Sequence, residues 1–259
     1  MNIFIIGATG FLGTNLVHFL IKEGHEITAI KRAKRFIHTS SIAAFGLHHN
    51  HIITEETEQL GEQCFANYYQ TKLLSERLVK TAVNERGLDA VILNPCHLVG
   101  PWDAHNWSQM LTMVVNEKLP GVPPGFGSFC HIEEIAKAHL QAAIKGRKGE
   151  NYILSGADAS FVEFVSEIGK LVGKKVPAKP MPHWLLKIVG HVSVFFARFT
   201  GKEPDMKPEK VLIVSEVLKV SSQKAQDELG YNADVTLNKM LNDCYQWMKN
   251  KNLLHSHAN

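Results

Sequence analysis

Two residues of one predicted helix have the spacing that acid/base chemistry needs. Tyr68 and Lys72 are four positions apart, so on a helix they lie one above the other on the same face. A lysine ammonium beside a phenol favours the phenolate form, which would let Tyr68 donate or accept a proton near neutral pH. Tyr and Lys at this spacing also occur on ordinary helices, so the pair needs support from the rest of the chain.

A glycine-rich turn near the N-terminus has the pattern of a pyrophosphate-binding loop. The segment Gly7-Ala8-Thr9-Gly10-Phe11-Leu12-Gly13 follows an apolar run, Ile3–Ile6, and precedes a segment with helical spacing, Thr14–Lys22. Glycines let the backbone approach a pyrophosphate, and the helix that follows presents free N–H groups and its positive dipole end. The strand–turn–helix context favours dinucleotide binding over a purely structural turn. We assign the cofactor site to Gly7, Thr9, Gly10, Phe11, Leu12 and Gly13.

Hydroxyl side chains end the predicted strand Arg35–Thr39. Thr39, Ser40 and Ser41 follow one another there, and the carboxyl ends of parallel strands are where such sheets bind ligands. Small hydroxyl residues at strand ends are common, so this signal gains weight only together with the glycine turn and the Tyr–Lys pair.

The elements that must position these residues alternate between strand and helix patterns. Strands are expected at Glu26–Ile30, Ala90–Leu93 and Asn151–Leu154, and helices at Tyr68–Asn84, Glu133–Lys145 and Ser160–Val172, the last with a Ser160/Glu163 capping box. Residues 97–128 are expected to be rich in loops. From Pro177 the composition shifts to Pro and large apolar residues, ending in helices at Ser222–Leu229 and Leu237–Lys249.

This order predicts an α/β fold with a Rossmann-type doubly wound parallel sheet and a small C-terminal substrate-binding part. We expect the dinucleotide-binding domain over residues 1–155, with 101–128 contributing to the substrate part, and the smaller part over 156–259. The Trp184–Phe199 segment contains Lys187, His191 and Arg198, and its uncharged runs are shorter than the ~20 residues of a spanning helix. We expect a buried or lid-forming helix there, not a transmembrane span.

The composition of the chain indicates which classes of binding partner are expected. The net charge is +3 with charged residues at 20%, which is too little and too mixed to indicate nucleic-acid binding. The four cysteines have no CxxC spacing, which favours reduced thiols in a cytoplasmic protein over a disulfide framework or a metal site. A small molecule is the expected partner.

In their order, the glycine turn, the hydroxyl strand end and the Tyr–Lys pair resemble the extended, epimerase/dehydratase-like branch of the short-chain dehydrogenase/reductase superfamily. The segment from Phe36 to Gly46 looks like the family's catalytic-serine strand, with Ser41 in the active position and Ser40 as the fallback. Asn94-Pro95-Cys96 followed by Gly100-Pro101 resembles the strand end that packs on the nicotinamide. The C-terminal half is most similar to dihydroflavonol-reductase and 3β-hydroxysteroid-dehydrogenase relatives.

The resemblance implies a catalytic set of Ser41, Tyr68 and Lys72. Tyr68 would exchange a proton with a substrate oxygen that Ser41 also hydrogen-bonds. Lys72 would support Tyr68 and hold the nicotinamide ribose, with Pro95 and Cys96 beside the ring. The Tyr68–Asn84 helix would be a natural homodimer face.

The end of the second predicted strand departs from the NAD-binding pattern. NAD-preferring relatives place Asp or Glu about 20 residues beyond the glycine turn, whereas this chain has Lys31 and Arg32 there. Cations suit the 2′-phosphate of NADP, although they could also be solvated loop charges. We expect NADP, with NAD as the other choice.

A larger departure is the short connection between the second strand and the serine strand. Only Lys31–Lys34 intervene, whereas a parallel crossover needs about a dozen residues, and four residues span at most about 14 Å. The chain could carry an internal deletion, a segment could be absent from the sequence, or the strands could form an antiparallel hairpin. We favour a missing segment, which would leave the adenine side incomplete.

Three functions follow as hypotheses. The first is an NAD(P)-dependent reductase or dehydrogenase that interconverts a ketone and an alcohol on a small hydrophobic substrate. The second is a sugar-nucleotide epimerase or dehydratase with tightly bound NAD. The third is a catalytically impaired remnant of the family that binds a ligand or partner.

Overall fold

A buried parallel sheet forms the centre of the molecule. The computed structural model describes residues 1–3, 5–7, 9–27, 34–48, 51–182 and 214–254. Strands β3 (Phe36–Thr39), β5 (Ala90–Pro95) and β8 (Asn151–Leu154) pair in parallel in the order β3-β5-β8. Every residue of β5 and β8 is buried, as expected for strands covered on both faces. The α/β class with a parallel sheet is therefore confirmed.

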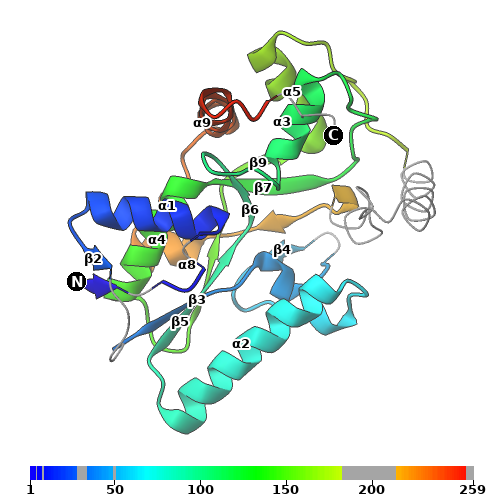
Figure 1. The fold of residues 1–259 in the computed structure, drawn as a ribbon. Helices are drawn as coiled ribbons and strands as arrows, with labels where there is room; N and C mark the ends of the chain where they lie inside the picture. The colour runs from blue at the N-terminus through cyan, green and yellow to red at the C-terminus, as the bar shows by residue number, and fades with distance from the viewer. Residues whose placement is uncertain (4, 8, 28–33, 49–50, 183–213, 255–259) are drawn as a thin grey trace, which may run out of the picture.

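Helices cover both faces of this sheet (Figure 1). Helix α2 (Asn67–Arg86) lies on one face, while α4 (Ile132–Lys145) and α8 (Gln223–Leu229) lie on the other, where α1 (Phe11–Lys22) packs against α4. Helix α2 ends at Gly87, which takes a left-handed conformation with φ 68°, the usual role of glycine after a helix. Because α2 runs back along the sheet, its first turns lie at the carboxyl end of β3.

The N-terminal strands lie outside the main sheet. Strand β1 (Asn2–Ile3) pairs in parallel with β2 (Glu26–Ile27), and these two strands form a separate sheet. The apolar run Ile3–Ile6, which is the pattern expected of a central strand covered on both faces, is not covered along its length, because Ile6 is 83% exposed. Among the described residues no pairing joins β2 to β3, and residues 28–33, which would form most of the alternative antiparallel hairpin, lie outside the described residues. The segment between β2 and β3, residues 28–35, is shorter than the dozen or more residues of a parallel crossover.

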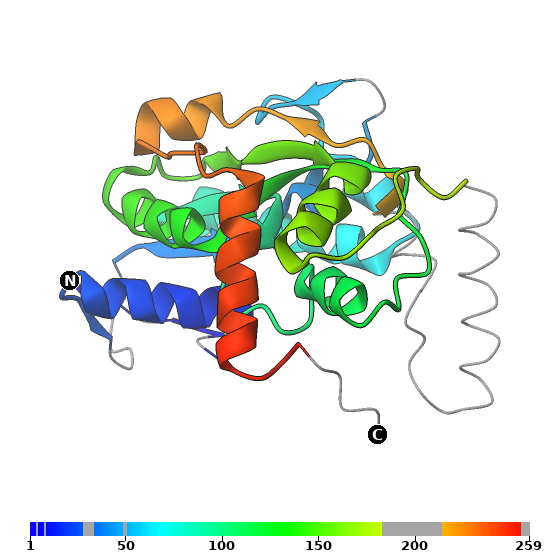
Figure 2. The same cartoon turned by 90° about the horizontal axis from the view of Figure 1, so that it is seen from above.

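A second sheet and three helices build the other core. Strand β7 (Phe126–His131) pairs in parallel with β6 (His97–Val99) and antiparallel with β9 (Ala157–Ser160). Helices α3 (Ser108–Val115), α5 (Phe161–Val172) and α9 (Leu237–Asn250) pack against one another beside this sheet (Figure 2). The capping box at the start of α5 is confirmed.

The expectation of loops over 97–128 is wrong, because β6, α3 and the start of β7 lie there. The prolines and glycines of this stretch dominated the sequence pattern. The buried side chains Leu111 and Val114 of α3 nevertheless have helical spacing.

Two short strands and two 3₁₀ turns complete the described elements. Strand β4 (Ile52–Ile53) pairs in parallel with β10 (Lys219–Val220), while η1 (Ile42–Phe45) and η2 (Gly61–Gln63) lie before α2. Each of β4 and β10 has only two residues, too few for a periodic sequence signal. Among the described helices none is long and apolar enough to cross a membrane; the Trp184–Phe199 segment lies outside the described residues.

Candidate active site and cofactor loop

The first turns of α2 bring Tyr68 and Lys72 to the carboxyl end of β3. The Lys72 ammonium lies 5.9 Å from the centre of the Tyr68 ring and donates hydrogen bonds of 3.3 Å to the carbonyl oxygens of Thr39 and Ser40. Tyr68 is 45% exposed. Burial lowers the pKa of Lys72.

The three hydroxyl residues at this strand end have different partners. Thr39 bonds the Nε2 atom of His139 at 2.8 Å, while the His139 Nδ1 atom lies 2.8 Å from the carbonyl of Ile135. That carbonyl can only accept, so Nδ1 carries the proton and Thr39 donates to Nε2. Ser40 donates its hydroxyl to Glu76. Both hydroxyls are therefore engaged within the protein.

Ser41 keeps a proton to donate. Its Oγ accepts a 3.2 Å hydrogen bond from the backbone N–H of Ala43 and caps the 3₁₀ turn η1. The side chain is buried, with 8% of its surface exposed. An oxygen that accepts from the backbone can still donate its own hydrogen to a ligand. Among the described residues, the Ser41 hydroxyl hydrogen thus has no acceptor, whereas the Ser40 hydroxyl is bonded to another side chain.

A buried carboxylate on α2 is a residue that the sequence reasoning missed. Glu76 is fully buried one helical turn after Lys72 and accepts hydrogen bonds from four side chains: Ser40, Gln59, Asn94 and Asn151. A signal existed, because Glu76 lies on the same helix face as Tyr69 and Leu73, which are also buried. A charged residue on the apolar face of a helix needs buried partners.

A second missed carboxylate comes from the C-terminal segment. Tyr69 is buried and donates its hydroxyl to the Glu216 Oε2 atom at 3.2 Å. Burial raises the pKa of Glu216 to about 7, and burial beside Glu216 also raises the pKa of Tyr69. The sequence pattern gave no indication of this contact, since Tyr69 and Glu216 are 147 positions apart and no periodicity connects them.

The glycine turn leads directly into α1. Gly7 has φ 80° and its carbonyl accepts a 3.0 Å bond from the N–H of Gly10, which is the N-cap of α1. The first turn, which contains Phe11, Leu12 and Gly13, has no acidic residue, and Thr9 beside it is exposed. A Cβ at position 7 would meet no atom within 4 Å. This open, positively polarised helix start fits a pyrophosphate.

The start of α1 lies beside residues that follow strands β3 and β5. Leu12 packs on the core cluster that contains Ile42 and Cys96, and the Asn15 amide donates to the carbonyl of Pro101 at 2.9 Å. Leu12 of the glycine turn therefore packs on the cluster that contains Ile42, the residue after Ser41. Lys31 and Arg32, which we assigned to the cofactor, lie outside the described residues.

Pro95 and Cys96 lie at the end of β5. Pro95 is the last residue of the strand, and the Cys96 N–H donates to the carbonyl of Leu154 at 3.0 Å. Burial holds the pKa of the Cys96 thiol well above its ordinary value, so this thiol is a packing group and not a reactive nucleophile. All four cysteines are unpaired and buried. Among the described residues no cluster has the ligands for a metal ion.

Comparison with known families identifies the lineage. The model of the "NAD dependent epimerase/dehydratase family" matches residues 3–35 and 31–155, which is more than half of the chain. The chain belongs to this family. The two matched segments meet at Lys31–Arg35, the position of the short connection, so the family pattern is interrupted where the crossover is missing.

Two curated relatives are named as a reductase and as a sterol demethylase protein. The chain is similar to the "Putative dihydroflavonol 4-reductase" of Synechocystis sp., at 21% identity over 325 aligned residues that cover 95% of this chain and 94% of the relative. It is also similar to the sterol demethylase protein B of Methylococcus capsulatus, at 24% identity, covering 85% of this chain and 68% of the relative. The first alignment is longer than the 259-residue chain, so the relative has residues with no counterpart here.

Solved structures confirm the Rossmann-type fold. A nucleoside-diphosphate-sugar epimerase from Pseudomonas aeruginosa superposes with a TM-score of 0.80 at 17% identity, covering 98% of this chain and 99% of its own. RMD from Pseudomonas aeruginosa, solved with NADPH, gives 0.71 at 12% identity, covering 96% and 99%. The dTDP-glucose 4,6-dehydratase from Bacillus anthracis, solved with NAD, gives 0.73 at 14% identity, covering 98% of both chains. Proteins of this fold thus bind either nicotinamide nucleotide.

Proposed function

We propose that this protein is an NAD(P)-dependent oxidoreductase that interconverts a ketone and an alcohol on a small hydrophobic substrate. The supporting observation is the position of Lys72, whose ammonium is fixed on the strand-end carbonyls 5.9 Å from the ring of the half-exposed Tyr68. Ser41 lies at the same strand end with a free hydroxyl hydrogen. The first turns of α2 and the end of β3 thus supply an acid, a supporting cation and a hydrogen-bond donor for this proposal, at the edge of the sheet where such folds bind ligands.

Each residue has a defined task in this proposal. Tyr68 donates a proton to the carbonyl oxygen in reduction, or removes one from the alcohol in oxidation. Ser41 donates a hydrogen bond to the same oxygen and orients it. The positive charge of Lys72 stabilises the Tyr68 phenolate that forms when the proton leaves.

The glycine turn is the proposed cofactor site. Gly7, Thr9, Gly10, Phe11, Leu12 and Gly13 would hold the pyrophosphate, Lys72 the ribose, and Pro95 and Cys96 the nicotinamide side. A bound nicotinamide would supply or accept the hydride. Lys31 and Arg32 favour NADP through its 2′-phosphate.

The proposed substrate class is apolar. The names of the relatives above, a dihydroflavonol reductase and a sterol-processing protein, support an aromatic or steroid-like ketone over a sugar nucleotide. We also expect a cytoplasmic protein, and a homodimer through α2, whose Leu74 and Leu78 side chains are 48% and 72% exposed. Sedimentation equilibrium tests the dimer.

Cofactor titration tests the proposed function. Purified protein is titrated with NADPH and with NADH while nicotinamide fluorescence is followed, and a panel of aromatic and steroid ketones is then assayed by NADPH consumption. We expect saturable NADPH binding and turnover of at least one ketone. Absence of binding of both nucleotides would leave the non-catalytic remnant as the function. Cofactor already bound on purification, together with conversion of a UDP- or dTDP-sugar, would instead identify an epimerase or dehydratase.

A further inference from the structure

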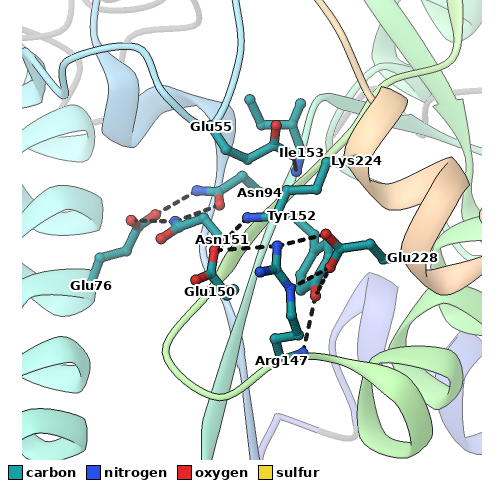
Figure 3. Close-up of polar contacts among 10 residues, drawn as sticks. All are labelled: Glu55, Glu76, Asn94, Arg147, Glu150, Asn151, Tyr152, Ile153, Lys224 and Glu228. Atoms are coloured by element: carbon teal, nitrogen blue, oxygen red, sulfur yellow. Dashed lines mark hydrogen bonds and ion pairs between the residues drawn. The ribbon is translucent and has the colours of Figure 1, made fainter.

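Glu76 is held by four neutral side chains that come from four different segments. Its Oε1 atom accepts from the Ser40 hydroxyl and the Asn94 amide, and its Oε2 atom accepts from the Gln59 amide at 2.6 Å and the Asn151 amide at 2.8 Å. Figure 3 shows Asn94 and Asn151 directed from the strands toward Glu76 on α2. Asn151 also donates to the Asn94 carbonyl at 2.8 Å, so the two amides fix one another.

This arrangement keeps a negative charge inside the protein. Glu76 is fully buried, and a buried carboxylate is stable only when its oxygens are satisfied by donors. All four donors are uncharged, so none of them neutralises it. Lys72 is the cation that interacts with Glu76 by charge, and this interaction raises the pKa of Lys72 against the opposing effect of burial.

Lys72 and Glu76 both form hydrogen bonds with Ser40, the residue that follows β3. Lys72 donates to the Ser40 carbonyl, and Glu76 accepts from the Ser40 hydroxyl. Two successive turns of α2 are thus fixed to one residue of the chain that leads into Ser41. Further contacts to Asn94 in β5 and Asn151 in β8 leave the helix little freedom to slide along the sheet.

The other titratable groups around Lys72 are His38 and Tyr68. His38 bonds the Ser75 hydroxyl at 3.1 Å, and burial lowers its pKa, so it is neutral near neutral pH. Tyr68 lies on the exposed side of Lys72. Within the described residues, Glu76 therefore supplies the charge that opposes desolvation of the Lys72 ammonium.

We propose that Glu76 is a positioning residue for the Tyr68–Lys72 pair, which anchors α2 to Ser40 after β3 and to strands β5 and β8, and which keeps Lys72 in its ammonium form. This inference rests on the proposed function of Tyr68 and Lys72 as the acid/base pair. It goes beyond that function because Glu76 touches neither substrate nor cofactor and acts through Lys72.

The test uses a variant that changes charge and leaves shape almost unchanged. Glu76→Gln is compared with Glu85→Gln, which alters an exposed glutamate near the end of the same helix. Lys72 ionisation is measured without substrate, as the pH dependence of its labelling by an amine reagent, read by mass spectrometry of its peptide. We expect the Lys72 midpoint to fall by about one pH unit or more in Glu76→Gln and to stay unchanged in Glu85→Gln.

Turnover supplies the second readout. In Glu76→Gln the basic limb of the pH–rate profile should move to lower pH by the same amount, and kcat should fall at least tenfold with little change in KM. A folded Glu76→Gln protein with an unchanged labelling midpoint would overturn the proposal. So would a variant that is only less stable, with the wild-type pH profile.

If Glu76→Gln does not fold, Glu76→Asp decides the question. It keeps the charge but shortens the reach to the four donors, so the proposal predicts a wild-type labelling midpoint with a reduced kcat. A wild-type kcat in Glu76→Asp would overturn the positioning role. Labelling needs no turnover. If the wild-type protein had no activity, the proposed function would be contradicted, but the labelling midpoint of Lys72 would still test the role of Glu76.

Discussion

Strands β3, β5 and β8 pair with one another inside the protein, whereas β1 and β2 form a separate sheet in which two residues of each pair among the described residues. The difference separates the two sides of the proposed cofactor cleft. The side with Ser41, Tyr68 and Lys72 is fixed by α2 and its buried polar contacts. The side with the glycine turn is attached mainly through α1, which packs on α4.

These two regions differ in how much of the family's site they can form when the connection between β2 and β3 is short. Acid/base chemistry needs one helix, one strand end and a few buried hydrogen bonds, all of which come from segments beyond Arg35. Dinucleotide binding also needs the neighbours of β1, and the exposed Ile6 side chain shows that the described residues do not supply them. We therefore expect a complete proton-transfer site beside a partial nucleotide site.

Removing the Tyr68 hydroxyl should have the largest effect. Tyr68→Phe takes away the proposed acid/base and should lower kcat by about 10²- to 10⁴-fold. The dissociation constant of NADPH should change less than about twofold, because the ring remains. Steady-state kinetics and fluorescence titration check the two effects, with Tyr245→Phe on α9 as the control. A fully active Tyr68→Phe protein would refute the assigned role.

Two leucine-to-alanine variants, one in the main sheet and one in α1, should destabilise the protein to different extents. Leu93 of β5 and Leu20 of α1 are both buried, at 0% and 1% exposure. Leu93→Ala should lower the free energy of unfolding by about 2–5 kcal/mol, because it opens a cavity in the main core. Leu20→Ala should mainly loosen α1, seen as faster amide exchange in residues 11–22, while global stability falls less. If urea unfolding showed the same loss in the free energy of unfolding for both variants, α1 would not be the less stable region.

Glu216 should make stability depend on pH. Its pKa in the folded protein is about 7, against an ordinary value of 4.5, so between these values the folded state holds a proton that the unfolded chain has lost. Stability should therefore fall as pH rises through this window and level off above it. Glu216→Gln should remove about 2 kcal/mol of this fall. Urea unfolding at several pH values measures it; parallel wild-type and variant curves would show that Glu216 ionises normally.

The second-strand cations should have the smallest effect. Arg32→Asp replaces a proposed 2′-phosphate contact with the carboxylate that NAD-binding relatives use. We expect NADPH affinity to fall about tenfold, or about 1.4 kcal/mol, with NADH affinity unchanged or higher. Lys22→Gln at the end of α1 is the control. An unchanged ratio of NADPH to NADH affinity would mean that Arg32 is a solvated charge.

Motifs with local spacing could be predicted from the sequence. The Tyr68/Lys72 helix, the glycine turn before α1, the hydroxyl end of β3 and the capping box of α5 all depend on residues close together in the chain. The family model and the parallel sheet agree with what those motifs implied. The departure from the family pattern at Lys31–Lys34 could also be predicted, because four residues are too few to join two parallel strands of one sheet.

Contacts between distant residues could not be predicted. Glu76 meets donors from Ser40 to Asn151, and Tyr69 meets Glu216, so neither partner set follows from periodicity. The apolar run Ile3–Ile6 is a related case. An apolar run shows that a strand could be buried, but its burial depends on neighbours that the described part of this chain does not provide.

The most direct test compares NADPH with reduced nicotinamide mononucleotide, which lacks the adenosine half. Both are titrated against the protein under the same salt conditions and followed by nicotinamide fluorescence. A site that is complete around nicotinamide, ribose and pyrophosphate but incomplete around adenine should bind both, with NADPH favoured by no more than about tenfold. A preference for NADPH of about a thousandfold would contradict the incomplete adenine side, and failure to bind either molecule would contradict the retained nicotinamide site.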